Sequence, residues 1–282
     1  MPRILLLLLI LISSCAHSAQ PTPEVKTPLQ LLTFNIRYGT ANDGAHAWPA
    51  RRELVADMIR TVNPDVLAIQ EALDFQLDEL ADVLKEYTKV GVHRGGGSKG
   101  EFSGLYVHPR QLSIHESGTF WLSTTPDVVA SKDWDAAITR TATWAELQWQ
   151  GQTLRIYGTH FDHVGKQARL ESARLIRKHA QGRQPVIVMG DLNAEESSAP
   201  LLEFFDNGYT SVVRQLMPDS VVGTFNGFKD PTGGRRIDHV LIFDPGATPL
   251  LETRSAQIHV QRVNGIFPSD HFPVSASFVL NQ

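Results

Sequence analysis

The sequence predicts an α/β fold: a four-layer α/β/β/α sandwich in which two packed, mostly antiparallel sheets lie between outer helices. Many strand-like segments are mixed along the chain with a few helical ones. Such a mixture buries its apolar surfaces when helices cover the outer faces of two packed sheets. Polar side chains also follow several strands where each strand ends, and rigid sheets commonly position functional groups at such places.

Length and composition are those of an ordinary globular protein. The chain has 282 residues, of which 42% are hydrophobic and 20% are charged. No linker rich in proline and serine divides it after residue 28, so we expect a single domain over residues 29–282. The sequence has no internal repeat, which argues against a solenoid.

The N-terminus has the pattern of an export signal. Arg3 precedes Ile4–Ile12, an apolar run that is too short to span a bilayer and is typical of a signal-peptide core. The residues Ile12-Ser13-Ser14-Cys15 then resemble a bacterial lipobox, which predicts lipidation of Cys15. The alternative is an ordinary secretory signal cut near residues 16–19.

Either signal predicts an exported protein. We expect residues 1–19 to form the signal and the polar, proline-rich residues 20–28 to form a short tether. The protein would be a periplasmic or cell-surface lipoprotein held to the outer or plasma membrane by its lipid anchor, and otherwise a secreted protein. Cys15 is the only cysteine, so one chain cannot form a disulfide. The net charge of −4 is unlike that of proteins that grip the DNA backbone, which are usually basic.

The first part of the domain alternates strands and helices. Leu29–Ile36 and Val66–Ile69 are apolar enough for buried strands. Trp48–Val62 has apolar residues at helical spacing, and Asn63-Pro64-Asp65 ends it. Asp74–Tyr87 predicts a second amphipathic helix.

Strands dominate the rest of the domain. Two further helices are predicted, at Lys166–Ala180 and Ser198–Phe205. The predicted strands are Thr88–Val92, Phe102–His108, Leu112–Leu122, Ala142–Gln150, Thr153–His160, Pro185–Met189, Ile237–Phe243, Ser255–Val263 and Val274–Leu280.

Asp191 and Asn193 lie two residues apart just after a buried strand. In an extended backbone both side chains project to one face. An aspartate accepts a hydrogen bond from water or ligates a cation, and an asparagine amide donates to a phosphoryl oxygen without adding negative charge. The pair therefore predicts a phosphate site, and an Asx turn that caps the next helix is the structural alternative.

Asp270 and His271 are adjacent just before the last strand. His271 is the candidate general base, because an imidazole titrates near ~6.5 and accepts a proton at neutral pH. Such a base needs a carboxylate on its other ring nitrogen to fix its orientation. Asp238, which leads another strand, is the candidate for this partner.

Glu71 and Asn35 end two N-terminal strands. A carboxylate at the end of an apolar strand is costly unless it is paired or bound to a metal. Asn35 adds a neutral oxygen ligand. Together with Asp270, these hard oxygen ligands predict a divalent cation that acts on phosphate.

His160 ends another strand and is followed by Phe161-Asp162-His163. We expect His160 to donate to a phosphate oxygen. A zinc hydrolase that uses His160 and His163 with Asp162 is the alternative, although the spacing is not a standard zinc pattern. Arg140 is a candidate for substrate binding, since a guanidinium suits bidentate recognition of phosphate, and its alternative is a structural role.

These residues together resemble the endonuclease/exonuclease/phosphatase superfamily, the DNase I-like hydrolases. The resemblance covers residues 29–280 and includes motifs similar to those of an uncharacterised bacterial branch, such as Asn-Ile-Arg at 35–37. Five motifs carry it in the family's order: Thr-Phe-Asn at 33–35, Gln-Glu at 70–71, Gly-Asp-Leu-Asn-Ala at 190–194, Arg-Ile-Asp at 236–238 and Ser-Asp-His-Phe-Pro at 269–273.

The resemblance implies a phosphoesterase that depends on Mg²⁺, or on Mn²⁺ in its place. Residues are assigned by their positions in the motifs. The resemblance implies that Asn35, Glu71 and Asp270 hold or adjust the metal, that Asp191 orients or activates the attacking water, that Asn193 and His160 stabilise the phosphoryl oxygens, and that Asp238 orients His271. Family members differ over the final base, so the choice between Asp191 and His271 stays open.

The implied reaction is hydrolysis of a phosphodiester by in-line attack of water. Fold and chemistry do not fix the substrate, so a lipid head group, a small organophosphate and a nucleic acid are all candidates. No protein partner is implied. A non-catalytic binding module on the same fold is the competing hypothesis, and the complete set of acid, base and ligand residues argues against it.

Overall fold

The computed structural model describes residues 27–182, 184–229 and 234–281, which form two six-stranded sheets. The strand order of the first sheet is β11 (Leu251–Ile258), β12 (Val274–Leu280), β1 (Leu29–Asn35), β2 (Val66–Ala72), β4 (Phe102–Val107) and β3 (Thr88–Val90). The strand order of the second sheet is β5 (Leu112–Trp121), β6 (Thr141–Trp149), β7 (Gln152–His160), β8 (Val186–Asp191), β10 (Asp238–Phe243) and β9 (Thr210–Ser211).

Each sheet contains one parallel pair of strands. β1 and β2 run parallel in the first sheet, and β7 and β8 run parallel in the second. The other paired strands are antiparallel. A parallel pair needs a crossover connection, and a helix provides it in both sheets. The prediction of mostly antiparallel sheets is therefore confirmed.

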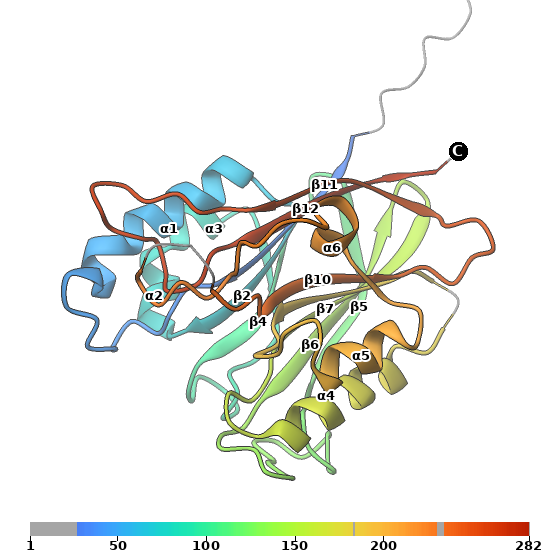
Figure 1. Cartoon of the computed structure of the whole chain (residues 1–282), viewed down its shortest axis with the longest axis horizontal. Coiled ribbons are helices and arrows are strands. Elements are labelled where there is room, and N and C mark those ends of the chain that lie inside the picture. The colour runs from blue at the N-terminus through green and yellow to red at the C-terminus, as the bar shows by residue number, and fades with distance from the viewer. Residues whose placement is uncertain (1–26, 183, 230–233, 282) are drawn as a thin grey trace, which may run out of the picture.

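Helices cover the outer face of each sheet (Figure 1). α1 (Trp48–Val62), α2 (Asp74–Glu79) and α3 (Ala81–Leu84) lie on the first sheet, and α4 (Lys166–His179) and α5 (Ala199–Phe205) lie on the second. The chain also forms a short 3-10 helix, η1 (Gly44–His46), and a short α-helix, α6 (Val212–Leu216). The four layers confirm the predicted α/β/β/α sandwich.

The alternation of side chains along the strands builds three apolar layers. Leu31 of β1 packs between the two sheets, whereas Leu32 packs against the helices of the first sheet with Val55. In β8, Met189 packs between the sheets and Val188 packs under the helices of the second sheet. Because successive side chains point to opposite faces, a strand that is buried on both faces reads as a continuous apolar run.

Two predicted elements differ most clearly from the structure. The helix predicted over Asp74–Tyr87 is two short helices, because the buried Leu80 leaves the helical conformation with φ −95° and ψ 4°. β11 begins and ends earlier than the predicted Ser255–Val263. Its pairing with β12 fixes the register and leaves the apolar side chains of Val260 and Val263 exposed.

The predicted export signal lies outside the described residues. Residues 1–26, which include Cys15, are not described, so the signal and the lipobox stay predictions. In the described ranges, no helix combines the length and the apolar character that crossing a membrane requires.

One buried carboxylate joins two loops at the same end of the second sheet. Asp162 accepts backbone hydrogen bonds from Ala137 and Ile138 through Oδ2, at 3.0 and 3.1 Å. Its Oδ1 accepts from Val164 and Gly165, at 2.9 and 2.7 Å. Burial alone would raise the pKa of Asp162, but these four donors hold it below its usual value. The connection between β5 and β6 is thereby fixed to the connection between β7 and α4.

We expect Asp162→Asn to destabilise the fold. Asparagine keeps the size of the side chain, but its amide nitrogen would face two backbone N–H donors and leave them without an acceptor. The free energy of unfolding, measured by urea denaturation, should fall by about 2–4 kcal/mol. The control is Glu203→Gln, which weakens a surface ion-pair cluster with Arg174 and Arg177 and should cost less than about 1 kcal/mol. Equal losses for the two variants would contradict the prediction.

Candidate active site

Strand ends from both sheets converge at one edge of the sandwich. In the second sheet β7, β8 and β10 are neighbours, and their register places His160 beside Asp191 and Asp191 beside Asp238. In the first sheet Asn35 ends β1, and Glu71 is the next-to-last residue of β2. Side chains that are far apart in the sequence therefore meet because the strands that carry them are adjacent or stacked.

Asp270 and His271 enter from the segment before β12, which is the other neighbour of β1. The backbone of Phe225 bridges that of His271, and the Phe272 N–H donates to the Thr224 carbonyl. These contacts hold the turn that carries Asp270 and His271 against the loop before β10.

Gly190 allows Asp191 to lie beside His160. Its φ is 152°, and a Cβ atom at this position would lie 1.9 Å from the carbonyl oxygen of Thr159 in β7. Glycine alone lets β8 approach β7 so closely at this point. This requirement explains the glycine that precedes the Asp-Leu-Asn sequence.

Glu71 has a backbone conformation that is unusual for a residue with a side chain. Its φ is 62°, and the pairing of β2 with β4 is irregular between Ile69 and Ala72. A left-handed residue costs roughly 1–2 kcal/mol, and bulges of this kind re-aim side chains next to functional sites. Here the irregularity places Glu71 Oε2 where it accepts a hydrogen bond from the Tyr38 N–H at 3.1 Å.

The Asn35 amide links the two sheets. Its Nδ2 donates to Glu71 Oε1 and to Asp191 Oδ2, both at 3.0 Å. Its Oδ1 accepts from the Arg37 N–H at 3.0 Å, which fixes the orientation of the amide. One neutral side chain therefore holds two carboxylates from different sheets close together.

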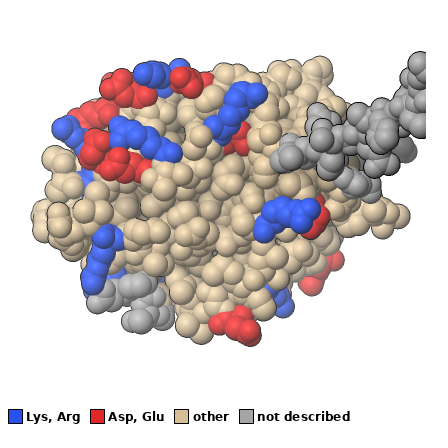
Figure 2. Space-filling model, turned by 90° about the horizontal axis from the view of Figure 1, so that it is seen from above, with Lys and Arg blue, Asp and Glu red and all other residues tan. Residues whose placement is uncertain are grey.

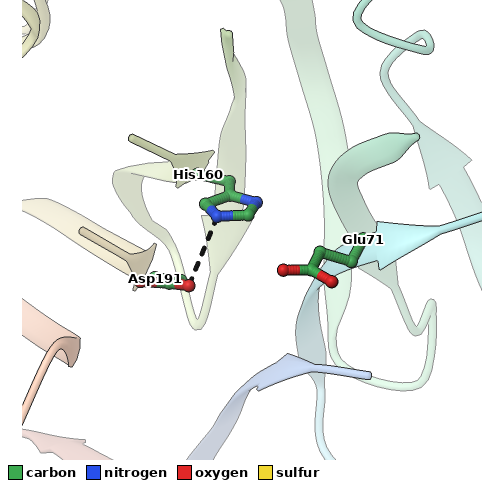
Figure 3. A group of neighbouring side chains, drawn as sticks. All are labelled: Glu71, His160 and Asp191. Carbon is green, nitrogen blue, oxygen red and sulfur yellow. Dashed lines mark ion pairs between the residues drawn. The ribbon is translucent and has the colours of Figure 1, made fainter. Parts of the chain in front are cut away.

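Glu71, His160 and Asp191 form a group that can hold a metal ion (Figure 3). One ligand atom from each lies within 4.8 Å of the others, and Glu71 reaches across from the first sheet toward the other two. Burial alone would raise the pKa of Glu71, but His271 and the hydrogen bonds from Asn35 and Tyr38 hold it below its usual value. His271 and the hydrogen bonds from His160 and the Asn193 N–H likewise lower the pKa of the buried Asp191. Both side chains are therefore carboxylates at neutral pH.

Asp270 is a third carboxylate in the same cavity. Burial, and to a smaller extent the charge of Glu71, raise the pKa of Asp270 above its usual value. The nearest cation is Arg37, whose Nη1 lies 3.6 Å from Asp270 Oδ2. The buried carboxylates of Asp191 and Asp270, the partly buried carboxylate of Glu71 and a neutral amide offer hard oxygens, which fit a divalent cation.

His271 lies between two carboxylates. Its Nδ1 is 2.9 Å from Asp238 Oδ2, and its Nε2 is 3.7 Å from Asp191 Oδ2. Burial by itself lowers the pKa of His271, but Asp238 and Asp191 raise it well above its usual value. The edge of Phe225 covers the ring, with the two ring centroids 5.1 Å apart. The orientation of His271 is thus fixed on three sides.

His160 has a different partner. Arg140 Nη1 lies 2.8 Å from its Nδ1, while its Nε2 is 3.3 Å from Asp191 Oδ2 and 3.1 Å from Asn193 Nδ2. Asn193 has a left-handed φ of 48°, and its N–H donates to Asp191 Oδ1 at 2.9 Å. Its side chain does not cap α5, whose N-cap is Ser198.

These side chains open on one cavity of about 640 Å³. All nine candidate catalytic, metal-binding and substrate-binding residues line it or contact a residue that lines it. Those that line it are Glu71, Arg140, His160, Asp191, Asn193, Asp270 and His271. Asn35 and Asp238 lie behind this wall and contact it through Asp191 and His271, respectively.

Several residues of the cavity were not predicted from the sequence. Arg37 donates two hydrogen bonds to Asp43, at 3.2 and 3.1 Å, beside Asp270. Its only sequence signal is its place in the Asn-Ile-Arg motif. The other unpredicted lining residues include Tyr38, Glu101, Phe225, Phe228 and Arg235.

The geometry does not favour the zinc alternative. The carboxylate of Asp162 is occupied by four backbone donors, and His163 Nδ1 lies 3.5 Å from Arg140 Nη2. Among the described residues, the groups of acidic and histidine side chains that can hold a metal contain His160 but neither Asp162 nor His163.

Comparisons with known proteins agree with this fold. The chain matches the Endonuclease/Exonuclease/phosphatase family over residues 32–271. The structure of the endonuclease/exonuclease/phosphatase from Bacteroides vulgatus is similar, with 32% identity, a TM-score of 0.81 and coverage of 91% of this chain and 100% of that one. The mannosyl-6-phosphatase of Bacteroides thetaiotaomicron has 30% identity, a TM-score of 0.80 and coverage of 89% and 99%. No curated protein matches the chain.

A more distant structure shares the fold alone. D. rerio TDP2 in complex with a single-strand DNA product is 18% identical, with a TM-score of 0.71 and coverage of 90% of this chain and 99% of that one. The fold and the buried Asp/His cluster define the class: a DNase I-like α/β sandwich that hydrolyses phosphoester bonds. The chain belongs to the endonuclease/exonuclease/phosphatase family.

The raised pKa of His271 predicts how stability depends on pH without a metal. In EDTA, folded His271 keeps its proton above the ordinary imidazole pKa of ~6.5, whereas the unfolded chain loses it. The free energy of unfolding should therefore decrease as the pH rises above this value, by up to about 1.4 kcal/mol per pH unit.

Asp238→Asn tests the origin of this dependence. The variant removes the carboxylate nearest to His271 while keeping its shape, so the pKa of His271 should fall and the slope above neutral pH should become shallower. Urea denaturation of both proteins at several pH values measures the two slopes. Identical slopes would contradict the assignment.

Proposed function

We propose that this protein is a divalent-metal-dependent phosphatase that hydrolyses a small phosphomonoester. The proposal rests on one observation: Glu71, Asp270, His160 and His271 open on a single cavity of about 640 Å³. Cavities of this size suit one small organic molecule. The sequence favoured a phosphodiester, but the cavity and the likeness to a mannosyl-6-phosphatase at 30% identity favour a monoester such as a sugar phosphate.

In this proposal Glu71 and Asp270 hold the cation, and Asn35 adjusts the site by orienting Glu71. Asn35 keeps Glu71 beside Asp191, and burial without a cation is unfavourable for so many carboxylates. When it is bound, the cation balances negative charge on the phosphoryl group and on the leaving oxygen.

Asp191 and His271 orient the attacking water and take its proton. Asp238 fixes Nδ1 of His271, so that Nε2 points toward Asp191. The separation of 3.7 Å between Nε2 and Asp191 Oδ2 places both groups around the same point of the cavity. We assign the proton to Asp191 and His271 together and not to either residue alone. The imidazole of His271 lies between the carboxylates of Asp191 and Asp238, and these three groups titrate together.

Asn193 and His160, which lie beside Asp191, stabilise the phosphoryl oxygens. Asn193 Nδ2 and His160 Nε2 lie 3.1 Å apart, and both residues line the cavity. Fixed donors that are aimed at developing negative charge lower the barrier, because they need no reorganisation during the reaction.

The surface supports a small substrate over a nucleic acid. On the face drawn in Figure 2, basic and acidic side chains lie beside one another and do not form a continuous basic strip. The ion pairs of Arg60 with Glu53 and Asp57 on α1 likewise place opposite charges side by side at the surface. Proteins that bind the nucleic-acid backbone commonly present clustered basic residues.

A substrate panel tests the proposal. The purified protein is assayed on mannose 6-phosphate, p-nitrophenyl phosphate, bis-p-nitrophenyl phosphate and single-stranded DNA, each with Mg²⁺ and with EDTA. We expect metal-dependent turnover of the monoesters. His271→Ala should lower kcat by about 10²–10⁴-fold, which is the contribution of general acid–base catalysis.

The matched control is His108→Ala. His108 pairs with Glu86 and does not line the cavity, so its loss should leave kcat unchanged. Faster turnover of the diester or of DNA would contradict the phosphatase proposal and would instead indicate a phosphodiesterase or a nuclease. Absence of metal-dependent turnover on the whole panel would favour the binding module.

We also propose that the protein acts in the cell envelope. The support is the lipobox-like sequence that ends at Cys15. Cys15→Ala should move the protein from the membrane fraction to the soluble fraction, because acyl chains supply the membrane affinity of such an anchor. Fractionation of cells that express each form measures this. Membrane retention of the variant would contradict a lipid anchor at Cys15.

A further inference from the structure

The Nδ1 atom of His160 faces a group that can only donate. Arg140 Nη1 lies 2.8 Å from it. A guanidinium carries five N–H donors, has no acceptor and keeps its charge. Nδ1 of His160 must therefore accept this hydrogen bond through its lone pair. A neutral imidazole has one proton, so the proton of His160 is on Nε2.

The protonated Nε2 is directed toward the cavity wall that would hold the phosphoryl group. Its acceptor in the structure is Asp191 Oδ2, at 3.3 Å. Asn193 Nδ2 lies 3.1 Å away and already donates one of its two hydrogens to the Phe161 carbonyl, also at 3.1 Å. The second Asn193 hydrogen and the His160 Nε2 proton are thus neighbouring donors. Two donors so close together suit one shared acceptor, and a phosphoryl oxygen is such an acceptor.

Glu101 lies near the guanidinium of Arg140, but the shortest polar contact of Arg140 is with His160. Its side chain is 5% exposed, and its Nη1 lies 3.8 Å from Glu101 Oε2. Glu101 is in turn bound by Arg94 at 3.0 Å. Arg140 Nε is buried and has no hydrogen-bond partner among the described residues. A buried guanidinium with an unsatisfied donor is costly, so a role that requires this exact contact explains the arginine better than packing does.

We propose that Arg140 is a positioning residue that fixes His160 as the Nε2-protonated tautomer, so that Nε2 acts as a hydrogen-bond donor in the cavity. This role rests on the proposed function, because the acceptor of that donor is the phosphoryl oxygen of the substrate. It replaces the direct substrate binding that the sequence suggested for Arg140. Without the guanidinium, the proton is free to occupy Nδ1, and the Nε2 lone pair would then face Asp191 and the phosphoryl oxygen.

The tautomer is observable without any substrate. Ring ¹⁵N chemical shifts of the histidine-labelled protein with Mg²⁺ distinguish a protonated from an unprotonated nitrogen, and His160→Gln assigns the signals. We expect an unprotonated Nδ1 and a protonated Nε2 in the wild type, and a mixed or reversed pattern in Arg140→Met. A wild-type His160 that carries a proton on Nδ1 overturns the proposal, even if Arg140→Met does not fold.

Kinetics separate positioning from substrate binding. With the monoester that the wild type hydrolyses, Arg140→Met should lower kcat by about 10–100-fold and leave KM nearly unchanged, as expected when a partner that orients a functional imidazole is lost. Because Arg140 acts through His160, the same substitution should have little further effect in a His160→Gln background. An increase in KM with an unchanged kcat would instead show direct binding of the substrate.

Arg94→Met is the matched control. It removes the other arginine that binds Glu101 but does not touch His160. We expect the wild-type tautomer and the wild-type kcat. An equal loss of kcat in Arg94→Met would assign the effect to the charge of Glu101 and overturn the proposal. If the wild type hydrolyses no phosphoester, the proposed function fails, while the ¹⁵N spectra still decide the tautomer.

Discussion

The site depends on one amide that joins the two sheets. Asn35 ends β1 of the first sheet, yet its Nδ2 donates both to Glu71 of that sheet and to Asp191 of the second. Two carboxylates so close together repel each other, and the neutral donor between them offsets this without adding charge. The strand ends can therefore meet at a polar centre, although the space between the sheets behind them is filled by apolar side chains.

A buried arginine also stabilises this polar centre. Arg51 of α1 is fully buried and donates to the carbonyl groups of Ile36, Arg37, His46 and Pro268. Burial lowers the pKa of Arg51 to about 10, while nearby carboxylates, that of Asp270 first, oppose this shift. The guanidinium thus holds two segments together: the one after β1, which follows Asn35, and the one before β12, which leads to Asp270. Its positive charge also offsets part of the negative charge of the cluster.

Local sequence patterns predicted the layers and the polar residues at strand ends, because both can be recognised from a few adjacent residues. The alternation at Leu31 and Leu32 gives two buried faces from sequence alone, and Asp191 stands out as a polar residue that ends an apolar strand. The role of Arg140 has no such signal. It comes from the connection between β5 and β6, and its contact with His160 depends on the pairing of β6 with β7 and on Asp162, which fixes that connection to the loop after β7. The break at Leu80 likewise follows from burial in the folded protein.

The two histidines of the site, His160 and His271, differ in the sign of the charged group that contacts Nδ1. His271 has the Asp238 carboxylate at its Nδ1, which favours a proton on that nitrogen and lets Nε2 exchange a proton with the cavity. His160 has the Arg140 guanidinium at its Nδ1, which can only donate and so excludes a proton on that nitrogen. One ring is therefore suited to proton transfer, and the other to permanent donation toward an oxygen. Because both Nε2 atoms lie near Asp191 Oδ2, at 3.7 and 3.3 Å, the charge behind each ring distinguishes the two roles where distance alone does not.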